Sequence, residues 1–204
     1  FFNGPKHALK ILQLLNEKHP SITYDSTIKV EHILKYPDYF QELKNLNMLF
    51  VISAFETTND HVLNILQKNH SSNDLNKAVE LSLENNIDIR PTWMPFSPWT
   101  EQNDLISIIK LIENYKLRET VDPIQLTIKL LVPKNSLILK RPEMKEYLLD
   151  YDPSSFSYAW KYKFPNIDNI QNELFTYVLQ HESENEYAQY LGLVDILESH
   201  TNET

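Results

Sequence analysis

Short apolar runs alternate with amphipathic helical patterns over the first 140 residues of the chain. Four of these runs have the length and the β-branched content of strands, and each is followed by apolar residues at helical spacing. The predicted strands are Ile22–Val30, Met48–Glu56, Ile87–Met94 and Val121–Val132. A strand–helix alternation of this kind predicts an α/β fold with a parallel sheet, which binds its ligands at the carboxyl ends of the strands.

The second predicted strand, Met48–Glu56, is apolar or small at nearly every position before its final carboxylate. A strand without polar alternation is expected to be covered on both faces. Polar residues that follow such a strand lie at the rim of the sheet, where parallel folds place their chemistry. The ends of the predicted strands are therefore the first places to look for a site.

The pattern changes beyond Arg141, where strand-like runs disappear. Helices are predicted at Glu143–Leu149, Ile167–His181 and Glu186–Glu198. We therefore expect a domain of β/α units over residues 1–140 and a helical C-terminal extension over residues 141–204.

Composition narrows the classes of function that remain. The net charge of −9 argues against non-specific nucleic-acid binding, which needs a basic face. The absence of cysteine excludes disulfides, thiolate metal sites and a cysteine nucleophile within these 204 residues. With only two glycines, the chain cannot form a glycine-rich phosphate loop. No apolar run is long enough for a membrane helix and no export signal is visible, so a cytoplasmic protein is expected.

The strand ends follow one another in a recognisable order. The segments concerned are Phe1–Ala8, Thr27–His32, Ser53–Thr57 with Val62, Leu63, Leu66 and Lys68, Arg90–Thr100, and Gln125–Pro133. Read in order, they resemble the region after the second strand and then the third to sixth strands of the radical SAM superfamily. Asp152-Pro153 and Tyr158-Ala159-Trp160, together with Pro98-Trp99-Thr100, are similar to the subgroup named for its cysteine-rich CCAEP tail.

This resemblance implies a partial parallel barrel of TIM-like type, an incomplete (β/α)6, followed by the helical extension. It also implies that the intact protein uses S-adenosylmethionine and a 4Fe–4S cluster to form a 5′-deoxyadenosyl radical, which abstracts a hydrogen from a small-molecule or peptide substrate. An electron donor would be a partner. The C-x-x-x-C-x-x-C cluster motif and the tail are absent. We therefore expect a fragment of a radical SAM enzyme that is inactive by itself.

Four residues are candidates for binding the cofactor. Glu56 matches, by resemblance, the fourth-strand position that contacts the ribose or amino group of S-adenosylmethionine, and a carboxylate can accept hydrogen bonds from either. Its alternative role is to cap the following helix. Lys29 and Glu31 share one face by the period of two and are predicted to line the cavity, or else to form an ion pair beside His32. Thr92, near the end of the third run, completes this set.

Four further residues are candidates for binding the substrate. Arg90 could clamp a carboxylate, while Phe96 and Trp99 could stack on a flat ligand. The alternative is that the aromatic side chains fill the core and that Arg90 lies at the beginning of its strand. Gln125, early in the fourth run, could face the same cavity. No catalytic residue and no metal site are assigned.

Two other classes of protein remain open. In a metal-dependent hydrolase of TIM-like fold, Glu31, His32 and Glu56 could hold a divalent cation through oxygen and imidazole ligands. Tight stoichiometric metal binding would favour that class. A non-catalytic partner-binding module is the second alternative, favoured if the chain folds cooperatively as a monomer.

Overall fold

The computed structural model describes residues 2–202, which form two compact units. Unit 1 contains the chain up to Phe55 together with His70–Thr92, and unit 2 contains Glu56–Asn69 and the chain from Trp93 onward. The division does not follow the boundary expected near residue 140. That boundary stays a prediction about the domain organisation of the intact protein.

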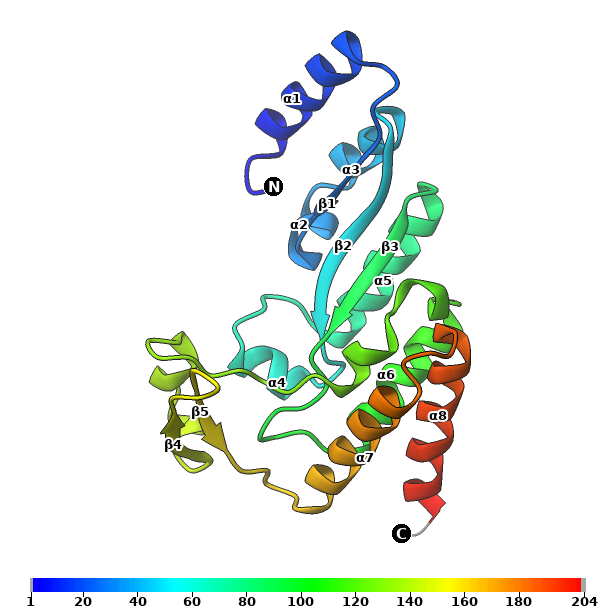
Figure 1. The fold of residues 1–204 in the computed structure, drawn as a ribbon. Helices are drawn as coiled ribbons and strands as arrows, with labels where there is room; N and C mark the ends of the chain where they lie inside the picture. Colours follow the sequence, from blue (N-terminus) through cyan, green and yellow to red (C-terminus); the bar gives the residue numbers. More distant parts are fainter. Residues whose placement is uncertain (1, 203–204) are drawn as a thin grey trace. The chain divides into compact units, whose positions relative to one another are not determined.

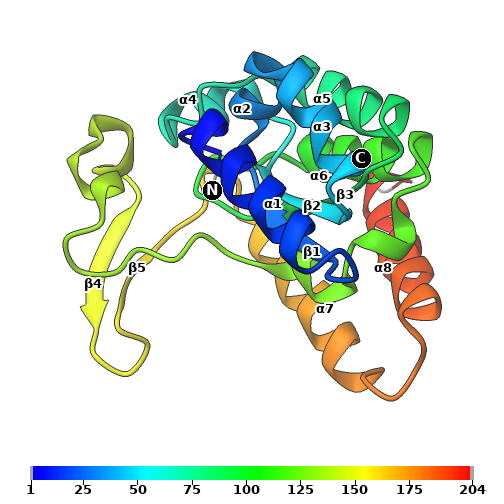
Figure 2. The same cartoon turned by 90° about the horizontal axis from the view of Figure 1, so that it is seen from above.

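Unit 1 is built on a three-stranded parallel sheet in the order β1–β2–β3 (Figure 1). The strands are β1 (Tyr24–Thr27), β2 (Met48–Glu56) and β3 (Asp88–Trp93), of which β2 and β3 each end with one residue of unit 2. The helices of this unit are α1 (Pro5–Lys18), α2 (Val30–Lys35), α3 (Pro37–Asn45) and α5 (Ser72–Glu84). Figure 2 shows α2, α3 and α5 along one face of the sheet. The predicted α/β class with a parallel sheet is confirmed.

The helical layer explains the burial of β2. Val51, Ser53 and Phe55 are fully buried, whereas Ile52 and Ala54 between them are half-buried. The expectation that both faces of this strand are covered was therefore wrong for the described residues. Burial alternates with a period of two along β2, because the helices α2, α3 and α5 lie along one side of the strand.

Helix α5 begins with a complete capping box, as its Ser-x-x-Asp sequence indicates. The Ser71 hydroxyl accepts a hydrogen bond from the Asp74 backbone N–H at 3.3 Å, and the Asp74 carboxylate accepts one from the Ser71 backbone N–H at 3.0 Å. The bond from the Ser71 N–H to the ionised carboxylate lowers the pKa of Asp74. The helix stops before Asn86, whose φ of 53° is the left-handed conformation expected there.

Unit 2 combines helices with a small hairpin. Its elements are α4 (Asp60–Ile65), α6 (Gln102–Asn114), α7 (Asn166–Gln180), α8 (Glu186–Asn202), the 3-10 helices η1 (Arg118–Thr120), η2 (Pro123–Thr127), η3 (Leu137–Lys140) and η4 (Pro142–Met144), and the strands β4 (Leu148–Asp152) and β5 (Ser157–Trp160). Helix α8 packs against both α6 and α7 (Figure 1). The two helices predicted in the last 40 residues are thus confirmed. Within residues 2–202 no helix has the length and apolar character needed to cross a membrane.

The fourth predicted strand, Val121–Val132, was wrong over most of its length. The Asp122 side chain accepts a hydrogen bond from the Ile124 backbone N–H at 3.1 Å, and Pro123 occupies the first position of η2. A capped start with a fixed proline φ favours helical geometry over an extended strand. Only Lys129 retains strand character, in an isolated parallel bridge with Phe96.

The helix predicted at Glu143–Leu149 was also wrong, because the helical geometry ends with η4 at Met144 and the chain turns into the strand β4 at Leu148. β4 and β5 pair antiparallel, with the rings of Tyr151 and Tyr158 5.2 Å apart across the pair. The Asp152 carboxylate turns the chain by accepting from the Ser154 backbone N–H at 2.9 Å. Aromatic cross-strand pairs stabilise such hairpins.

Gly192 of α8 provides a test of the contact between α7 and α8. A Cβ atom at this position would collide with the phenol ring of Tyr177 on α7. That ring is half-buried and stacks on His181, so it can move but loses this stacking. We expect Gly192→Ala to destabilise the protein by about 1 kcal/mol, at the lower end of overpacking costs, in a thermal unfolding experiment. In a Tyr177→Ala background the same substitution should have no destabilising effect.

Candidate functional site

Glu56 ends β2 in an unusual backbone conformation. Its φ is 64°, in the left-handed region that residues with a Cβ atom rarely adopt. Its backbone carbonyl accepts a hydrogen bond from the Met94 N–H at 2.9 Å, and its carboxylate forms an ion pair with Lys68. The alternative that Glu56 caps the next helix is contradicted, since the Asn59 side chain caps α4 by accepting from the His61 and Val62 N–H groups.

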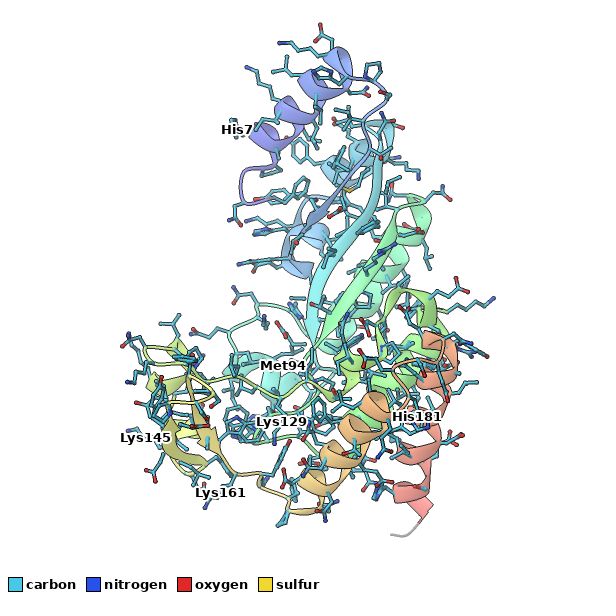
Figure 3. The ribbon with its side chains drawn as sticks, viewed as in Figure 1. His7, Met94, Lys129, Lys145, Lys161 and His181 are labelled. Atoms are coloured by element: carbon cyan, nitrogen blue, oxygen red, sulfur yellow. The ribbon has the colours of Figure 1, made fainter. Side chains whose placement is uncertain are left out.

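The Glu56 side chain lines a cavity of about 290 Å³ within unit 2. The polar and charged residues around it are Glu56, Gln67, Lys68, Ser136 and Arg141. Met94, labelled in Figure 3 beyond the end of β3, Leu130, and apolar side chains from η3 and the end of α4 complete the lining. Small-molecule sites usually start at about 300 Å³, so this cavity has room for part of a nucleoside-sized ligand.

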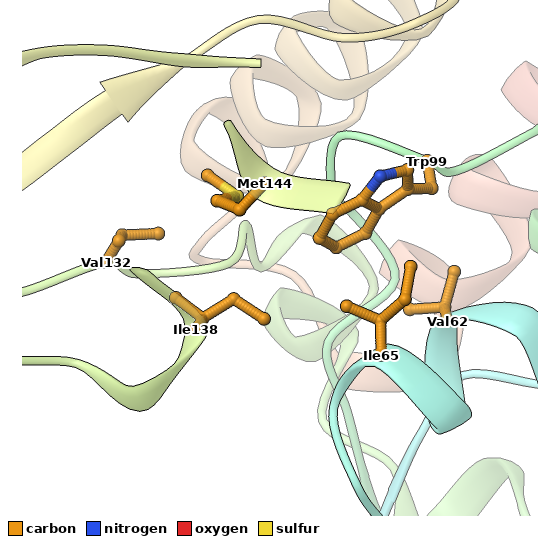
Figure 4. Packing of buried hydrophobic residues seen from close by; sticks show 6 residues of the cluster. All are labelled: Val62, Ile65, Trp99, Val132, Ile138 and Met144. Atoms are coloured by element: carbon orange, nitrogen blue, oxygen red, sulfur yellow. The ribbon is translucent and has the colours of Figure 1, made fainter. Parts of the chain in front are cut away.

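The wall of the cavity is fixed by Arg141 and by a small core. The Arg141 Nε atom donates to the Ile65 carbonyl oxygen at 3.0 Å, which ties η3 and η4 to the end of α4. Behind this contact lies a buried apolar cluster, shown in Figure 4. Its members are Val62, Ile65, Trp99, Val132, Ile138 and Met144. This packing holds the last turn of α4 in place against the segment that carries Arg141.

The two aromatic candidates lie in the interior of unit 2. Phe96 is completely buried, and Trp99 is only 5% exposed. The Trp99 ring meets the edge of Tyr147 with centroids 6.2 Å apart. Both rings therefore have packing roles in this structure, as the alternative interpretation of the sequence expected.

Arg90 and Thr92 lie on the less buried face of β3. Arg90 is the third residue of the strand, and its guanidinium carbon lies 3.7 Å from the centroid of the Phe50 ring. This cation–π contact explains why an arginine is stable at this position. Gln125 belongs to η2 rather than to a strand, and its side-chain oxygen accepts a hydrogen bond from the Trp93 backbone N–H at 3.0 Å. The Gln125 side-chain oxygen is thus engaged by a backbone N–H group.

The prediction that Lys29 and Glu31 share a strand face was wrong. The last sheet bond of this segment joins the Ile28 N–H to the Ile52 carbonyl, and Glu31 already belongs to the first turn of α2. Val30 and Ile33, three residues apart, are fully buried and favour the helix. Lys29 still reaches Glu31 at 3.6 Å, with His32 3.3 Å away on the same carboxylate. The ion-pair alternative describes this cluster.

Of the eight sequence candidates, only Glu56 lines the 290 Å³ cavity. Its charged neighbours Lys68 and Arg141 were not predicted as site residues. Lys68 had one available signal, because it belongs to the fourth-strand pattern that resembles the radical SAM superfamily. Arg141 carried no signal, since its place depends on the packing of η3 and η4 on α4.

Two larger cavities in unit 2 are less suited to chemistry. One of about 570 Å³ between α6 and α8 is lined largely by apolar side chains and long charged stems. Another of about 510 Å³ near Trp99 has carboxylates on exposed residues at its rim. Among residues 2–200, whose side chains are described, no three potential metal ligands lie close enough to hold an ion. The metal-hydrolase alternative therefore has no candidate centre in this part of the chain.

Comparison with known structures places the fold among those of S-adenosylmethionine radical enzymes. The chain is similar to the cobalamin-dependent S-adenosylmethionine radical enzyme OxsB with aqua-cobalamin and S-adenosylmethionine bound, with a TM-score of 0.70 and 10% identity. The structure of OxsB with aqua-cobalamin gives a TM-score of 0.70 at 11% identity, and the apo form gives 0.65 at 12%. No protein-family model matches the sequence, and no curated protein is similar enough to count as a relative.

The likeness covers 96% of this chain but only 36% of OxsB in the S-adenosylmethionine complex. The chain thus spans about a third of the length of that enzyme. At 10% identity the likeness shows the fold, and it does not carry the activity or the cofactors of OxsB to this chain. A radical SAM-like fold is the coarse conclusion that the comparison supports.

Proposed function

We propose that this chain is part of a radical SAM enzyme and that Glu56 contacts S-adenosylmethionine. The observation that carries the proposal is the Glu56 carboxylate, which ends a parallel strand in the left-handed conformation and lines a cavity with charged neighbours. Non-glycine residues in this conformation persist where the surrounding structure holds them, and they are concentrated at functional sites. The likeness to OxsB over nearly the whole chain supports the same assignment.

The residues around the cavity fit parts of S-adenosylmethionine. The Glu56 carboxylate can accept hydrogen bonds from ribose hydroxyls or from the ammonium group, and Arg141 offers positive charge for a carboxylate. When bound with its cluster, the cofactor would supply a 5′-deoxyadenosyl radical that abstracts a hydrogen. The role of this chain would be to bind and orient the ligand and to limit its contact with water.

The chain cannot hold the 4Fe–4S cluster, because it contains no cysteine. The cluster ligands and the contact with an electron donor would have to come from elsewhere in an intact protein. We propose that β1, β2 and β3 correspond to the third to fifth strands of a partial TIM-like barrel. Thr92 and Arg90, on the less buried face of β3, then remain candidates for contacts with ligand. Membership of the CCAEP subgroup is a finer proposal, based on the Tyr158–Trp160 stretch.

Ligand-observed NMR on the full 204-residue chain tests the proposal, because it detects binding into the millimolar range. The probes are S-adenosylmethionine and 5′-methylthioadenosine, which shares the ribose but lacks the amino acid. We expect both to bind the wild type, and Glu56→Gln to weaken S-adenosylmethionine binding about tenfold or more, since a hydrogen bond to a charged group contributes about 1.5–3 kcal/mol.

The two probes also locate the contact. An equal loss for both with Glu56→Gln assigns the carboxylate to the ribose, and a loss confined to S-adenosylmethionine assigns it to the ammonium group. Glu182→Gln, at an exposed carboxylate on the segment between α7 and α8, is the matched control and should leave binding unchanged. Folded wild-type protein that binds neither probe would overturn the proposal. An affinity for both probes that does not change in Glu56→Gln would overturn it as well.

A further inference from the structure

The Glu56–Lys68 ion pair is the most sheltered Lys–carboxylate pair among the described residues. The Lys68 and Glu56 side chains are 28% and 18% exposed, whereas Lys29, Lys77 and Lys129 in the other such pairs are 41–67% exposed. Water and salt screen a pair of this kind less than an open surface pair. The pair lines the 290 Å³ cavity, so its geometry decides which carboxylate oxygen a ligand meets.

The backbone at the end of α4 fixes the position of Lys68. Gln67 adopts a left-handed φ of 56°, and its N–H donates to the Asn64 carbonyl at 3.0 Å. The Lys68 N–H donates to the Leu63 carbonyl at 3.1 Å. These two bonds form a Schellman motif, in which glycine usually occupies the left-handed position. Here glutamine occupies it, and Lys68 follows directly with its Cα held by the motif.

The backbone of Glu56 at the end of β2 is also fixed. Its φ of 64° costs about 1–2 kcal/mol for a residue with a Cβ atom, and its carbonyl is held by the Met94 N–H. Both partners of the ion pair are therefore set by left-handed residues: Glu56 has this conformation itself, and Gln67 directly precedes Lys68. Lys68 contacts Oε1, and within the described residues no further hydrogen bond is formed to Oε2.

We propose that Lys68 is the positioning residue of this site. It holds the Glu56 carboxylate in one orientation through Oε1, so that Oε2 is presented to the hydroxyls or the ammonium group of the ligand. This inference rests on the proposed function, because it concerns the same carboxylate. A lysine suits the task because it contacts one oxygen as a point charge, whereas the planar fork of an arginine tends to engage both oxygens.

A double-mutant cycle on ligand binding tests the inference. The proteins are wild type, Glu56→Gln, Lys68→Gln and the double variant, each titrated with S-adenosylmethionine and with 5′-methylthioadenosine. We expect Lys68→Gln to weaken binding of the probe that Glu56 contacts about five- to tenfold in the wild-type background, less than the loss of the carboxylate itself, because the hydrogen bond to the ligand is misaligned and not removed. In the Glu56→Gln background it should have no further effect, because there is no carboxylate left to position.

Two further variants separate positioning from folding. Lys68→Met keeps the aliphatic volume without the charge, and it should lose affinity as Lys68→Gln does while retaining the far-UV CD spectrum of wild type. Lys68→Arg keeps the charge, but its planar fork tends to engage both carboxylate oxygens, so it should restore only part of the affinity. Lys77→Gln, at an exposed lysine that pairs with Asp74 on α5, is the matched control and should not change binding.

The possible failures can be told apart. If the folded wild type binds neither probe, or if Glu56→Gln has no effect, the proposed function fails. If Glu56→Gln weakens binding and Lys68→Gln does not, only the positioning role of Lys68 fails. Equal losses from Lys68→Gln with and without the Glu56 carboxylate would also overturn that role, because the lysine would then act on the ligand directly.

Discussion

Replacing Trp99 with alanine is expected to destabilise unit 2 by about 3–5 kcal/mol, the range for truncating a buried aromatic side chain. The indole is 5% exposed and packs with Val62, Ile65 and Met144 behind the cavity wall (Figure 4). Its loss leaves a void between α4 and the segment from Val132 to Met144. The same segment carries Arg141, so we expect the contact between Arg141 and the end of α4 to loosen as well.

The chain forms two units, so one global unfolding curve is insufficient for this test. Urea unfolding followed by far-UV CD should be combined with hydrogen exchange of the amides in α4, where the loss should be concentrated. Phe156→Ala is the control, because Phe156 is 74% exposed and its removal should change stability by less than about 0.5 kcal/mol. A similar small loss for Trp99→Ala would contradict the packing role and would return Trp99 to the substrate candidates.

The elements that sequence could predict are those whose signals are local. β2 has the predicted limits, Met48–Glu56, because its apolar run is bounded by polar residues at the carboxyl end. α5 begins where its Ser-x-x-Asp box predicts. By contrast, the apolar run from Val121 to Val132 fits a strand or a buried helix equally well by composition. The Asp-Pro start at residues 122–123 favours the 3-10 helix, because the Asp122 side chain caps it and Pro123 has a helical φ.

The hairpin of β4 and β5 has a local sequence signal in its turn. Asp152-Pro153-Ser154-Ser155 is a turn sequence between two short runs that each carry a tyrosine, Tyr151 and Tyr158. The runs are too polar to stand out by hydrophobicity, and a two-stranded sheet draws its stability from cross-strand pairs and from packing on other elements. The strand pairing is therefore visible only when the turn is recognised first.

The site was predictable only where it depends on one strand end. Glu56 follows from the rule that parallel strands bear their chemistry at their carboxyl ends. Lys68 reaches the cavity because the chain makes a left-handed turn at Gln67, and Arg141 reaches it because its side chain donates a hydrogen bond to the Ile65 carbonyl. The position of Arg141 depends on how distant segments pack, which no local pattern encodes, whereas Lys68 is held by a local turn at the end of α4. The prediction for Glu31 failed for a different reason. It required the first strand to continue to residue 30, whereas β1 ends at Thr27 and α2 begins at Val30.

Removing the carboxylate of Glu113 is the second change with a large expected effect. Glu113 near the end of α6 accepts hydrogen bonds from Arg118 Nε at 2.8 and 2.9 Å and from the Tyr190 hydroxyl of α8 at 2.8 Å. Tyr190 is 1% exposed, so its hydroxyl has little access to water as a replacement partner. We expect Glu113→Ala to cost about 1–3 kcal/mol, because the buried hydroxyl of Tyr190 loses its acceptor.

Tyr190→Phe separates the two contributions. It removes the donor together with its need for a partner, so it should cost about 1 kcal/mol or less. In the Tyr190→Phe background, Glu113→Ala should cost less than it does in the wild type. Thermal unfolding of the four proteins at pH 7 measures this coupling, and additive losses would contradict the proposed link between α6 and α8.

The same network predicts how the stability of unit 2 depends on pH. The hydrogen bonds from Arg118 are the main cause that lowers the pKa of Glu113 below its ordinary value of 4.5, and burial raises the pKa of Tyr190 above its usual range. A carboxyl whose pKa is lower in the folded state contributes stability above its unfolded pKa and loses it as the pH falls through the folded value. The difference in melting temperature between wild type and Glu113→Gln should therefore be largest above about pH 5 and should shrink below about pH 4. Glu182→Gln, at a carboxylate on an exposed residue, should show no such change. A difference that stays constant down to pH 3 would mean that Glu113 holds α8 by packing and not by its charge.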